Sequence, residues 1–300
     1  MKIVFALIKR NIKLFFKDKA MFLTSLITPV ILLVLYATFL GNVYRDSFLA
    51  FLPEGLVLSD QVLGGIVGGQ LMSSILAVSC VTVAVCSNFL TVQDKANGSI
   101  RDFLVSPVHP AHLAVGYYIA SFCSTMIICL CAAVICFVYL AFVGWYLAVA
   151  DVFLILLDIF LLVLFGTALS SIINLFLSTN GQISAFGTIV SSGYGFVSGA
   201  YMPISQFSSG LQNVIACLPG TYGTSLMRGH CMQGAISELA SLGIPADAIA
   251  EIKRSMDCSI SFFGHEVSTL GSYGILIGTD LLLIAIYVLL NVYRMKKAKK

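Results

Sequence analysis

The chain has 300 residues, of which 59% are hydrophobic and 10% are charged, and its formal net charge is +3. A typical soluble domain has roughly 25% charged residues, so this chain has too little polar surface to cover a water-soluble globule. The composition therefore excludes a soluble protein and indicates an integral membrane protein that has lipid as its solvent.

Stretches without Asp, Glu, Lys or Arg locate the membrane spans, because a transmembrane helix needs about 20 mostly apolar residues. These stretches predict six helices, over residues 20–40, 62–90, 112–142, 152–177, 182–203 and 270–292. The glycines of "GGIVGGQL" (64–71) lie in the second helix, where they favour close helix packing. The predicted fold is an all-α integral membrane protein with six transmembrane helices.

The basic residues predict the orientation. With six spans, both termini share a side with Lys95 and Arg101, so thirteen of the 17 Lys and Arg residues fall on that face. The other four lie on the opposite face: Arg45, Arg228, Lys253 and Arg254. The positive-inside rule then places both termini in the cytoplasm. The expected location is the plasma membrane, taken to be that of a prokaryotic cell.

Residues 1–19 predict an amphipathic helix. Lys2, Lys9, Arg10, Lys13 and Lys17 gather in one sector of the helical wheel. Apolar residues cover the opposite side, with Asn11 as its polar exception. Such a helix lies along the cytoplasmic interface, with its lysines toward lipid phosphates or a partner. From this segment alone, a simple positive-inside anchor is an equally good interpretation.

A short polar segment, "QDKANGSIRDFLVSPVHPAHL" (93–113), interrupts the apolar stretches. Asn97-Gly98-Ser99 predicts a turn and a helix cap, followed by one or two helical turns over 100–105. Ser106-Pro107 and His109-Pro110 end that helix. A short rigid helix at the cytoplasmic face suits docking into another protein's groove, although composition alone favours an ordinary connecting loop.

Two motifs give the chain a resemblance to a known family. The first is Asp94-Lys-x-x-Gly98-Ser-x-Arg-Asp102-Phe-Leu-x-Ser106-Pro107. The second follows the fifth predicted span: Ser198-Gly199-Ala-Tyr-Met-Pro203, then Leu218-Pro219-x-Thr-Tyr222, ending near Arg228. With both motifs in this order, six spans and an amphipathic N-terminal helix, nearly the whole chain resembles the permeases of ABC-2 type transporters. Ser99 replaces the Thr that is common in that family.

The resemblance implies the membrane subunit of an exporter that pairs with a second permease and binds two copies of a cytoplasmic ATPase. It makes residues 93–111 the coupling loop and residues 1–19 the helix that packs beside it. The implied ATPase-coupling residues are Lys9, Lys13, Lys17, Asp94, Gly98, Ser99, Arg101, Asp102, Leu104, Ser106 and Pro107. The chain has no Gly-Lys dipeptide and hence no Walker phosphate loop, so ATP and Mg would bind the partner ATPase and the permease would not be an enzyme.

The resemblance also implies the structure of the outer side. Residues 204–228, with Pro219, Tyr222 and Arg228, would form re-entrant helices, since backbone at membrane depth must be satisfied internally. Residues 229–268, independently of the resemblance, are the largest hydrophilic stretch and are expected to form an external cap, with a solvated loop as the default interpretation. The pathway candidates are Tyr194, Phe196, Ser198, Gly199, Tyr201 and Pro203, although core packing accounts for any one of them alone. An apolar, aromatic pathway favours a hydrophobic or amphipathic cargo such as a drug, an antimicrobial peptide or a lipid-like molecule.

Two carboxylates in predicted spans, Asp158 and Asp280, support a different hypothesis, a stand-alone ion-coupled carrier. Each would cost about 2.5–3.5 kcal/mol at mid-membrane if unpaired, so each is expected to face a polar partner or a water-filled cavity. Helix pairing explains Asp158 equally well. A third hypothesis, an intramembrane hydrolase with Ser198 as its nucleophile, lacks a histidine in any span, since His230 and His265 are placed outside.

The nine cysteines and four histidines give few further candidates. Cys231 and Cys258 could close a disulfide across the external cap. His109 and His112 share the coupling loop without further ligands nearby, so no metal site is predicted.

Overall fold

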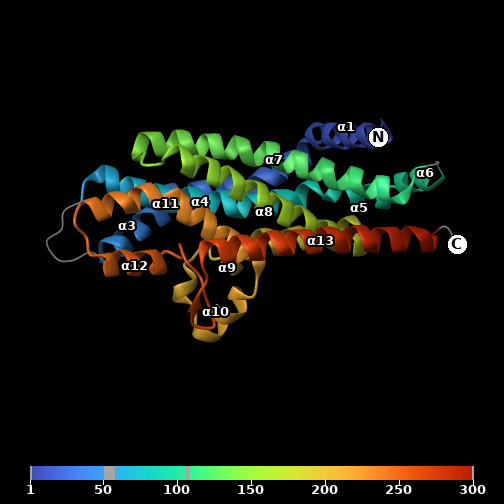
Figure 1. The fold of residues 1–300 in the computed structure, drawn as a ribbon. Coiled ribbons are helices and arrows are strands. Elements are labelled where there is room, and N and C mark those ends of the chain that lie inside the picture. Colours follow the sequence, from blue (N-terminus) through green and yellow to red (C-terminus); the bar gives the residue numbers. More distant parts are fainter. Residues whose placement is uncertain (1, 51–57, 106–107, 299–300) are drawn as a thin grey trace.

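The computed structural model describes residues 2–50, 58–105 and 108–298, most of which are helical (Figure 1). The helices before the outer region are α1 (Lys2–Lys17), α2 (Lys19–Leu35), the π-helix η1 (Tyr36–Leu40), α3 (Gly41–Ala50), α4 (Asp60–Ser87), α5 (Phe89–Ala96), α6 (Ser99–Val105), α7 (Pro110–Val143), α8 (Val149–Phe176) and α9 (Asn180–Val197). There follow the 3-10 helix η2 (Ile204–Gln206), α10 (Ser209–Ala216), α11 (Pro219–Ser241), α12 (Ala246–Ser255), the antiparallel strands β1 (Ser261–Phe262) and β2 (His265–Glu266), and α13 (Thr269–Ala298).

Five of the described helical segments are long and apolar enough to cross a membrane: Lys19–Asp46, Asp60–Ala96, Ala111–Val143, Val149–Phe176 and Thr269–Arg294. They correspond to the first four predicted spans and the last. The fifth predicted span, 182–203, is occupied by α9, which has 18 residues and a polar first turn and is not among these five. The structure therefore supports an all-α membrane protein, while the count of six spans stays a prediction.

The centre of the bundle is α4, which contacts α2, α7, α8 and α11 and is buried along almost its whole length. Glycines allow these close contacts. A Cβ on Gly69 would lie 2.7 Å from the Cys231 carbonyl oxygen on α11, and one on Gly64 would lie 2.6 Å from the Val143 carbonyl oxygen on α7. Close backbone packing at small residues holds membrane helices together where burial from water cannot.

One end of the bundle holds both termini and α6, and the other end holds α3 and α12 (Figure 1). At the first end, α1 packs along α7 and buries a stripe of Leu7, Asn11 and Phe15, spaced four residues apart. This spacing is that of one helix face. The cationic residues of α1 lie off this stripe.

At the second end, the predicted boundary between re-entrant helices and external cap falls inside a helix. α11 is continuous from Pro219 to Ser241, so residue 228 is in its interior. Apolar residues at helical spacing on both sides of this boundary pack against α4 and α8, among them Met227, Cys231 and Ile236. Their burial favours one long helix over two separate units.

Candidate functional site

We call α1, α5 and α6 together the coupling face, after the role expected of the segment that contains α6. The short helix predicted over 100–105 is present as α6, beginning at Ser99. Gly98 joins α5 to α6 with a φ of +79°, a left-handed conformation that favours glycine. His109 caps α7 by accepting a hydrogen bond from the backbone N–H of Ala111. Ser106 and Pro107 lie outside the described residues.

Arg10 of α1 joins the helices of this face. Its guanidinium donates two hydrogen bonds to Asp94 of α5, with Nη1 2.7 Å from Oδ2 and Nη2 3.1 Å from Oδ1. The Tyr117 hydroxyl of α7 donates to the same carboxylate, at 2.5 Å. The Arg10 guanidinium also lies 5.4 Å from the centre of the Phe103 ring on α6. The hydrogen-bonded Asp94 raises the pKa of Arg10, which therefore stays charged.

These contacts change the interpretation of Asp94, which the family resemblance assigned to the ATPase contact. Asp94 is 5% exposed, and its carboxylate oxygens are hydrogen-bonded to Arg10 and Tyr117. It ties α5 to α1 and α7, because a buried carboxylate needs hydrogen-bond partners within the fold. The sequence placed Arg10 only among the basic residues of the first helix and indicated no role for Phe103 or Tyr117. The opposite charges of Arg10 and Asp94 were the available signal.

The side chains of the other predicted coupling residues differ in their exposure to solvent. Lys9, Lys13, Lys17 and Asp102 are exposed, and Ser99 is half-buried. The side chains of Arg101 and Leu104 lie outside what the structure describes. The exposed residues give this face four charged groups that a partner could contact, on two helices that Arg10 connects.

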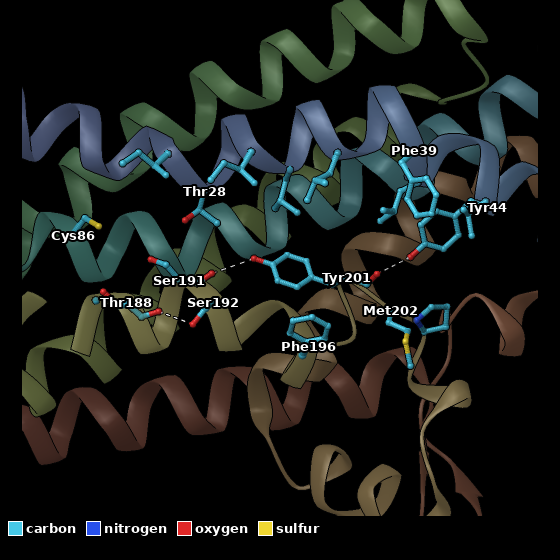
Figure 2. Close-up of a pocket in the computed structure, with 18 of the residues that line it drawn as sticks. Thr28, Phe39, Tyr44, Cys86, Thr188, Ser191, Ser192, Phe196, Tyr201 and Met202 are labelled. Carbon is cyan, nitrogen blue, oxygen red and sulfur yellow. Dashed lines mark hydrogen bonds between the residues drawn. The ribbon is translucent and has the colours of Figure 1, made fainter. Parts of the chain in front are cut away.

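A large groove opens along the membrane-spanning side of the bundle (Figure 2). Its volume is about 1790 Å³, and its walls are α2, η1 and α3 on one side and α9 with the following turn on the other. Most of the lining is apolar, with hydroxyl groups such as Thr28 and Ser191 among it. Among the lining residues, charges occur only at the two ends, on Asp18 at the start of α2 and on Asp247, Glu251 and Arg254 of α12.

Tyr201 lies in the middle of this groove, between α9 and the helices of the first span (Figure 2). Its hydroxyl donates to the Ser191 carbonyl oxygen at 3.2 Å, and its own carbonyl oxygen accepts from the Tyr44 hydroxyl at 3.3 Å. The Phe196 ring packs edge-on against it, with centroids 5.1 Å apart. Among the pathway candidates, Phe196, Tyr201 and Pro203 line the groove.

The remaining pathway candidates are not in the groove. Tyr194 packs inside the bundle, where its hydroxyl faces Gly220 at the start of α11. Ser198 is 2% exposed. Gly199 forms a turn with a φ of +74°. The reason is helical periodicity, since residues 194 and 198 lie one turn apart on the face of α9 that is turned away from the groove.

Comparison with known proteins assigns the family. The family model described as ABC-2 type transporter matches residues 3–231, which include α1, the coupling face and every helix of the groove except α12. The chain belongs to the ABC-2 type transporter family. A search of curated proteins found no match. A membrane domain of this family is a permease component of an ABC transporter and is not itself the ATPase.

In this permease, Arg228 holds the turn that follows α9. It is fully buried, although it was predicted to lie in a re-entrant hairpin. Its guanidinium donates to the carbonyl oxygens of Gly199 (2.8 Å) and Met256 (3.1 Å), and it pairs with Asp257 Oδ2 at 3.2 Å. Asp257 also accepts from the Ile204 backbone N–H at 2.6 Å. Burial raises the pKa of Asp257 to about 6, against the lowering effect of Arg228.

Three consecutive carbonyl groups of this turn each accept from a different element. Gly199 accepts from Arg228 of α11, Ala200 from the Tyr36 hydroxyl (3.0 Å), and Tyr201 from the Tyr44 hydroxyl. Tyr36 begins the π-helix η1, and π-helical turns are frequent at functional sites. The end of the groove beside α12 is therefore fixed to the first span and to α11 together. The other two hairpin residues support the same region: Pro219 begins α11, and the Tyr222 hydroxyl donates to the Ala216 carbonyl oxygen.

The permease places His230 inside the bundle, which corrects the expectation that it lies outside. Its Nδ1 is 2.6 Å from Asp158 Oδ2, and the Tyr273 hydroxyl donates to Asp158 Oδ1 at 2.8 Å. Because α11 continues past residue 228, His230 faces α8. Asp158 thus has the polar partners that were expected. The described contacts of His230 do not include Ser198, so the hydrolase hypothesis gains no support.

The disulfide predicted between Cys231 and Cys258 is absent, and both are free thiols. Cys231 packs in the core cluster around α4. Cys258 packs against another cluster, with Sγ 4.0 Å from Met232 Sδ. The continuity of α11 points the Cys231 side chain into the bundle, where Cys258 does not reach it.

Proposed function

We propose that this permease is one half of an ATP-driven exporter, in which two copies enclose a path for a hydrophobic or amphipathic compound. A separate cytoplasmic ATPase would bind at the coupling face. The observation that carries the proposal is the set of contacts around the Arg10–Asp94 pair. Arg10 joins α1 to α5 and α6, and Tyr117 joins α7 to Asp94. A force applied to α6 would therefore be shared by the helix that contacts lipid and by the span that follows.

The groove supports the proposed path. One wall, α2 with η1, exposes large apolar side chains such as Ile27, Val30, Val34 and Phe39, all at least half exposed. An exposed apolar surface of that kind is expected to contact lipid or a second protein surface. A second copy facing this side would close the groove. Uncharged walls with hydroxyl groups suit a cargo that is apolar with some hydrogen-bonding groups.

The proposed orientation places α6 and both termini in the cytoplasm, in agreement with the basic residues at that end. ATP hydrolysis would move α1 and α6 together. That motion would pass to α7 and, through the packing of α4 against α2 and α9, to both walls of the groove. The outer turn held by Arg228 would stay in place as the mouth of the path.

The test is a charge reversal on the coupling face with a matched reversal at the opposite end. Asp102→Lys changes an exposed residue of α6, and Asp46→Lys changes an exposed residue of α3. In vesicles that contain the permease and its co-purified ATPase, Asp102→Lys should reduce ATP-driven uptake of a lipophilic dye by about tenfold or more. Asp46→Lys should transport normally. Equal transport by both variants, or dye transport by the permease alone on an ion gradient, would overturn the proposal.

A further inference from the structure

The two carboxylates within the spans have opposite environments. Asp158 is fully buried and both of its oxygens are hydrogen-bonded, to His230 and Tyr273. Asp280 on α13 is also buried, at 3% exposed. Among the described residues, neither of its oxygens has a hydrogen-bond partner. Asp280 is therefore a buried acid for which the fold supplies no counter-charge.

The surroundings of Asp280 explain why it has no partner. It is buried one helical turn after Leu276, which packs with Leu161 and Phe165 of α8, and α13 as a whole contacts α7, α8 and α11. The tyrosine hydroxyls of this region are already used. Tyr273 donates to Asp158, Tyr287 donates to the Ala114 carbonyl oxygen, and Tyr118 donates to the Leu164 carbonyl oxygen. Tyr118 of α7 is close enough to Asp280 to interact with it electrostatically.

The charged groups near this face are also occupied. Asp158 and His230 pair with each other near Tyr273, one heptad from Asp280 toward the start of α13. Arg294, two heptads from Asp280 in the other direction, donates to the Leu175 carbonyl oxygen and stacks on Phe176. Within the described part of the chain, no Lys or Arg forms an ion pair with Asp280.

An isolated carboxylate in such a place is too costly to stay ionised, and a buried acid of this kind is neutralised instead. We propose that Asp280 is a proton-binding site, which holds a proton as a neutral carboxylic acid between α7, α8 and α13. The site is separate from the groove, whose lining includes no residue of α7 or α13. It does not make the protein an ion-coupled carrier, because the proton lies outside the proposed path of the cargo.

A direct test uses N,N′-dicyclohexylcarbodiimide, an apolar reagent for protonated carboxyl groups in membranes. A nitrogen of the reagent takes the carboxyl proton, the carboxylate oxygen bonds to the central carbon, and acyl transfer to nitrogen leaves a stable N-acylurea. Peptide mapping by mass spectrometry of the full-length permease in lipid nanodiscs should locate the adduct on Asp280. Asp158 should stay unmodified because its oxygens are hydrogen-bonded. An unmodified Asp280, or equal modification of both residues, would overturn the proposal.

A second test measures the proton through stability. A carboxyl group that keeps its proton in the folded bundle and loses it in the unfolded chain makes the fold less stable as the pH rises. Asp280→Asn has the same shape and cannot ionise. Its melting temperature should match that of the wild type at about pH 4 and exceed it increasingly toward about pH 8. A difference that does not change with pH would contradict the proposal.

The matched control is Asp158→Asn, which removes an acceptor from a site where both oxygens are used. Its melting temperature should fall below that of the wild type, because a donor of His230 or Tyr273 is left unpaired. A control that behaved like Asp280→Asn would show that the pH effect reflects any intramembrane acid, and would overturn the assignment to Asp280.

The position of α7 gives the proton site a role in the cycle, and this step rests on the proposed function. α7 begins at Pro110, shortly after α6, so a displaced coupling helix would move the wall beside Asp280. In the complex with its ATPase, trapping with ATP and vanadate should change the rate of carbodiimide labelling at least several-fold. An unchanged rate would overturn the link to the cycle. Failure to co-purify an ATPase would count against the proposed function, and labelling of the permease alone would still decide whether Asp280 holds a proton.

Discussion

The two ends of the permease are each held by an Arg–Asp pair, and the two pairs differ in burial. Arg10–Asp94 joins the helices of the coupling face, and the Arg10 side chain is 33% exposed. Arg228–Asp257 holds the outer turn, and the Arg228 side chain is 1% exposed. Both arginines also contact groups on other elements, namely Phe103 for Arg10 and the Gly199 carbonyl oxygen for Arg228.

The difference in burial suits the two proposed tasks. A buried pair cannot be opened without leaving a charge in a low-dielectric interior, so it acts as a fixed support. In the other pair Asp94 is buried, but the Arg10 side chain is one-third exposed and Tyr117 also donates to Asp94. Water can therefore replace part of the Arg10 contacts as the helices move. The coupling face is thus held by adjustable contacts, and the end of the groove beside α12, which we propose is its outer mouth, is held rigidly.

The largest effect is expected at Arg228. Arg228→Ala leaves the Asp257 carboxylate and the carbonyl oxygens of Gly199 and Met256 without this donor, and should cost about 3–5 kcal/mol of unfolding free energy. The measurement is thermal melting of the protein in nanodiscs, together with the yield of folded protein. If the charge is what matters, the double variant Arg228→Ala with Asp257→Asn should be more stable than Arg228→Ala, because Asn tolerates the φ of +54° at residue 257 and leaves no unpaired charge. Wild-type melting in Arg228→Ala would show that the outer turn is not held by this pair.

The next effect is expected at Arg10, in coupling more than in stability. Arg10→Ala separates α1 from α5 and α6, and should reduce cargo-stimulated ATP turnover by a factor on the order of 5 to 150. Melting should change much less than in Arg228→Ala. Tyr117→Phe is the matched control, because it removes one hydrogen bond to Asp94 and keeps the Arg10 pair. Loss of stability without loss of coupling in Arg10→Ala would reverse the assignment of the two pairs.

These two pairs also show how far the sequence could predict the structure. The stretches without charged residues predicted the five helices that are long and apolar enough to cross a membrane. The turn residues Asn97-Gly98 predicted the start of α6. The signal is local in both cases, since hydropathy and turn chemistry depend on neighbouring residues. The burial of Asp94 depends on Arg10, 84 residues earlier in the chain. No local pattern indicates a contact of that length.

The same reason explains the errors at the outer end. His230 was placed outside because it falls in the hydrophilic stretch 229–268, which was interpreted as an external cap. Its partner Asp158 is 72 residues earlier, and together the two are satisfied inside the bundle. Residues 226–239 of α11 do have apolar residues at helical spacing, and attention to that period would have predicted one continuous helix and a buried Cys231.

A smaller effect is expected from the contact between Arg10 and α6. Phe103→Leu keeps an apolar side chain and removes the ring that faces the guanidinium. A cation–π contact at a partly exposed site is worth about 0.5–1 kcal/mol, so coupling should fall only a few-fold while melting stays close to that of the wild type. Phe103→Tyr keeps the ring and should couple normally. Equal losses in the Leu and Tyr variants would mean that shape, and not the ring, joins α6 to Arg10.

The smallest effect is expected from a third pair, Arg254–Glu266, between α12 and β2. Its side chains are 67% and 49% exposed, and the two atoms that pair lie 3.3 Å apart. An exposed ion pair contributes about 0.2–1 kcal/mol and is screened by salt. Glu266→Gln should therefore lower the melting temperature slightly at low ionic strength and not at all at high ionic strength. A loss as large as that in Arg228→Ala would mean that burial does not rank these pairs, and the distinction between a rigid outer end and an adjustable coupling face would have no energetic basis.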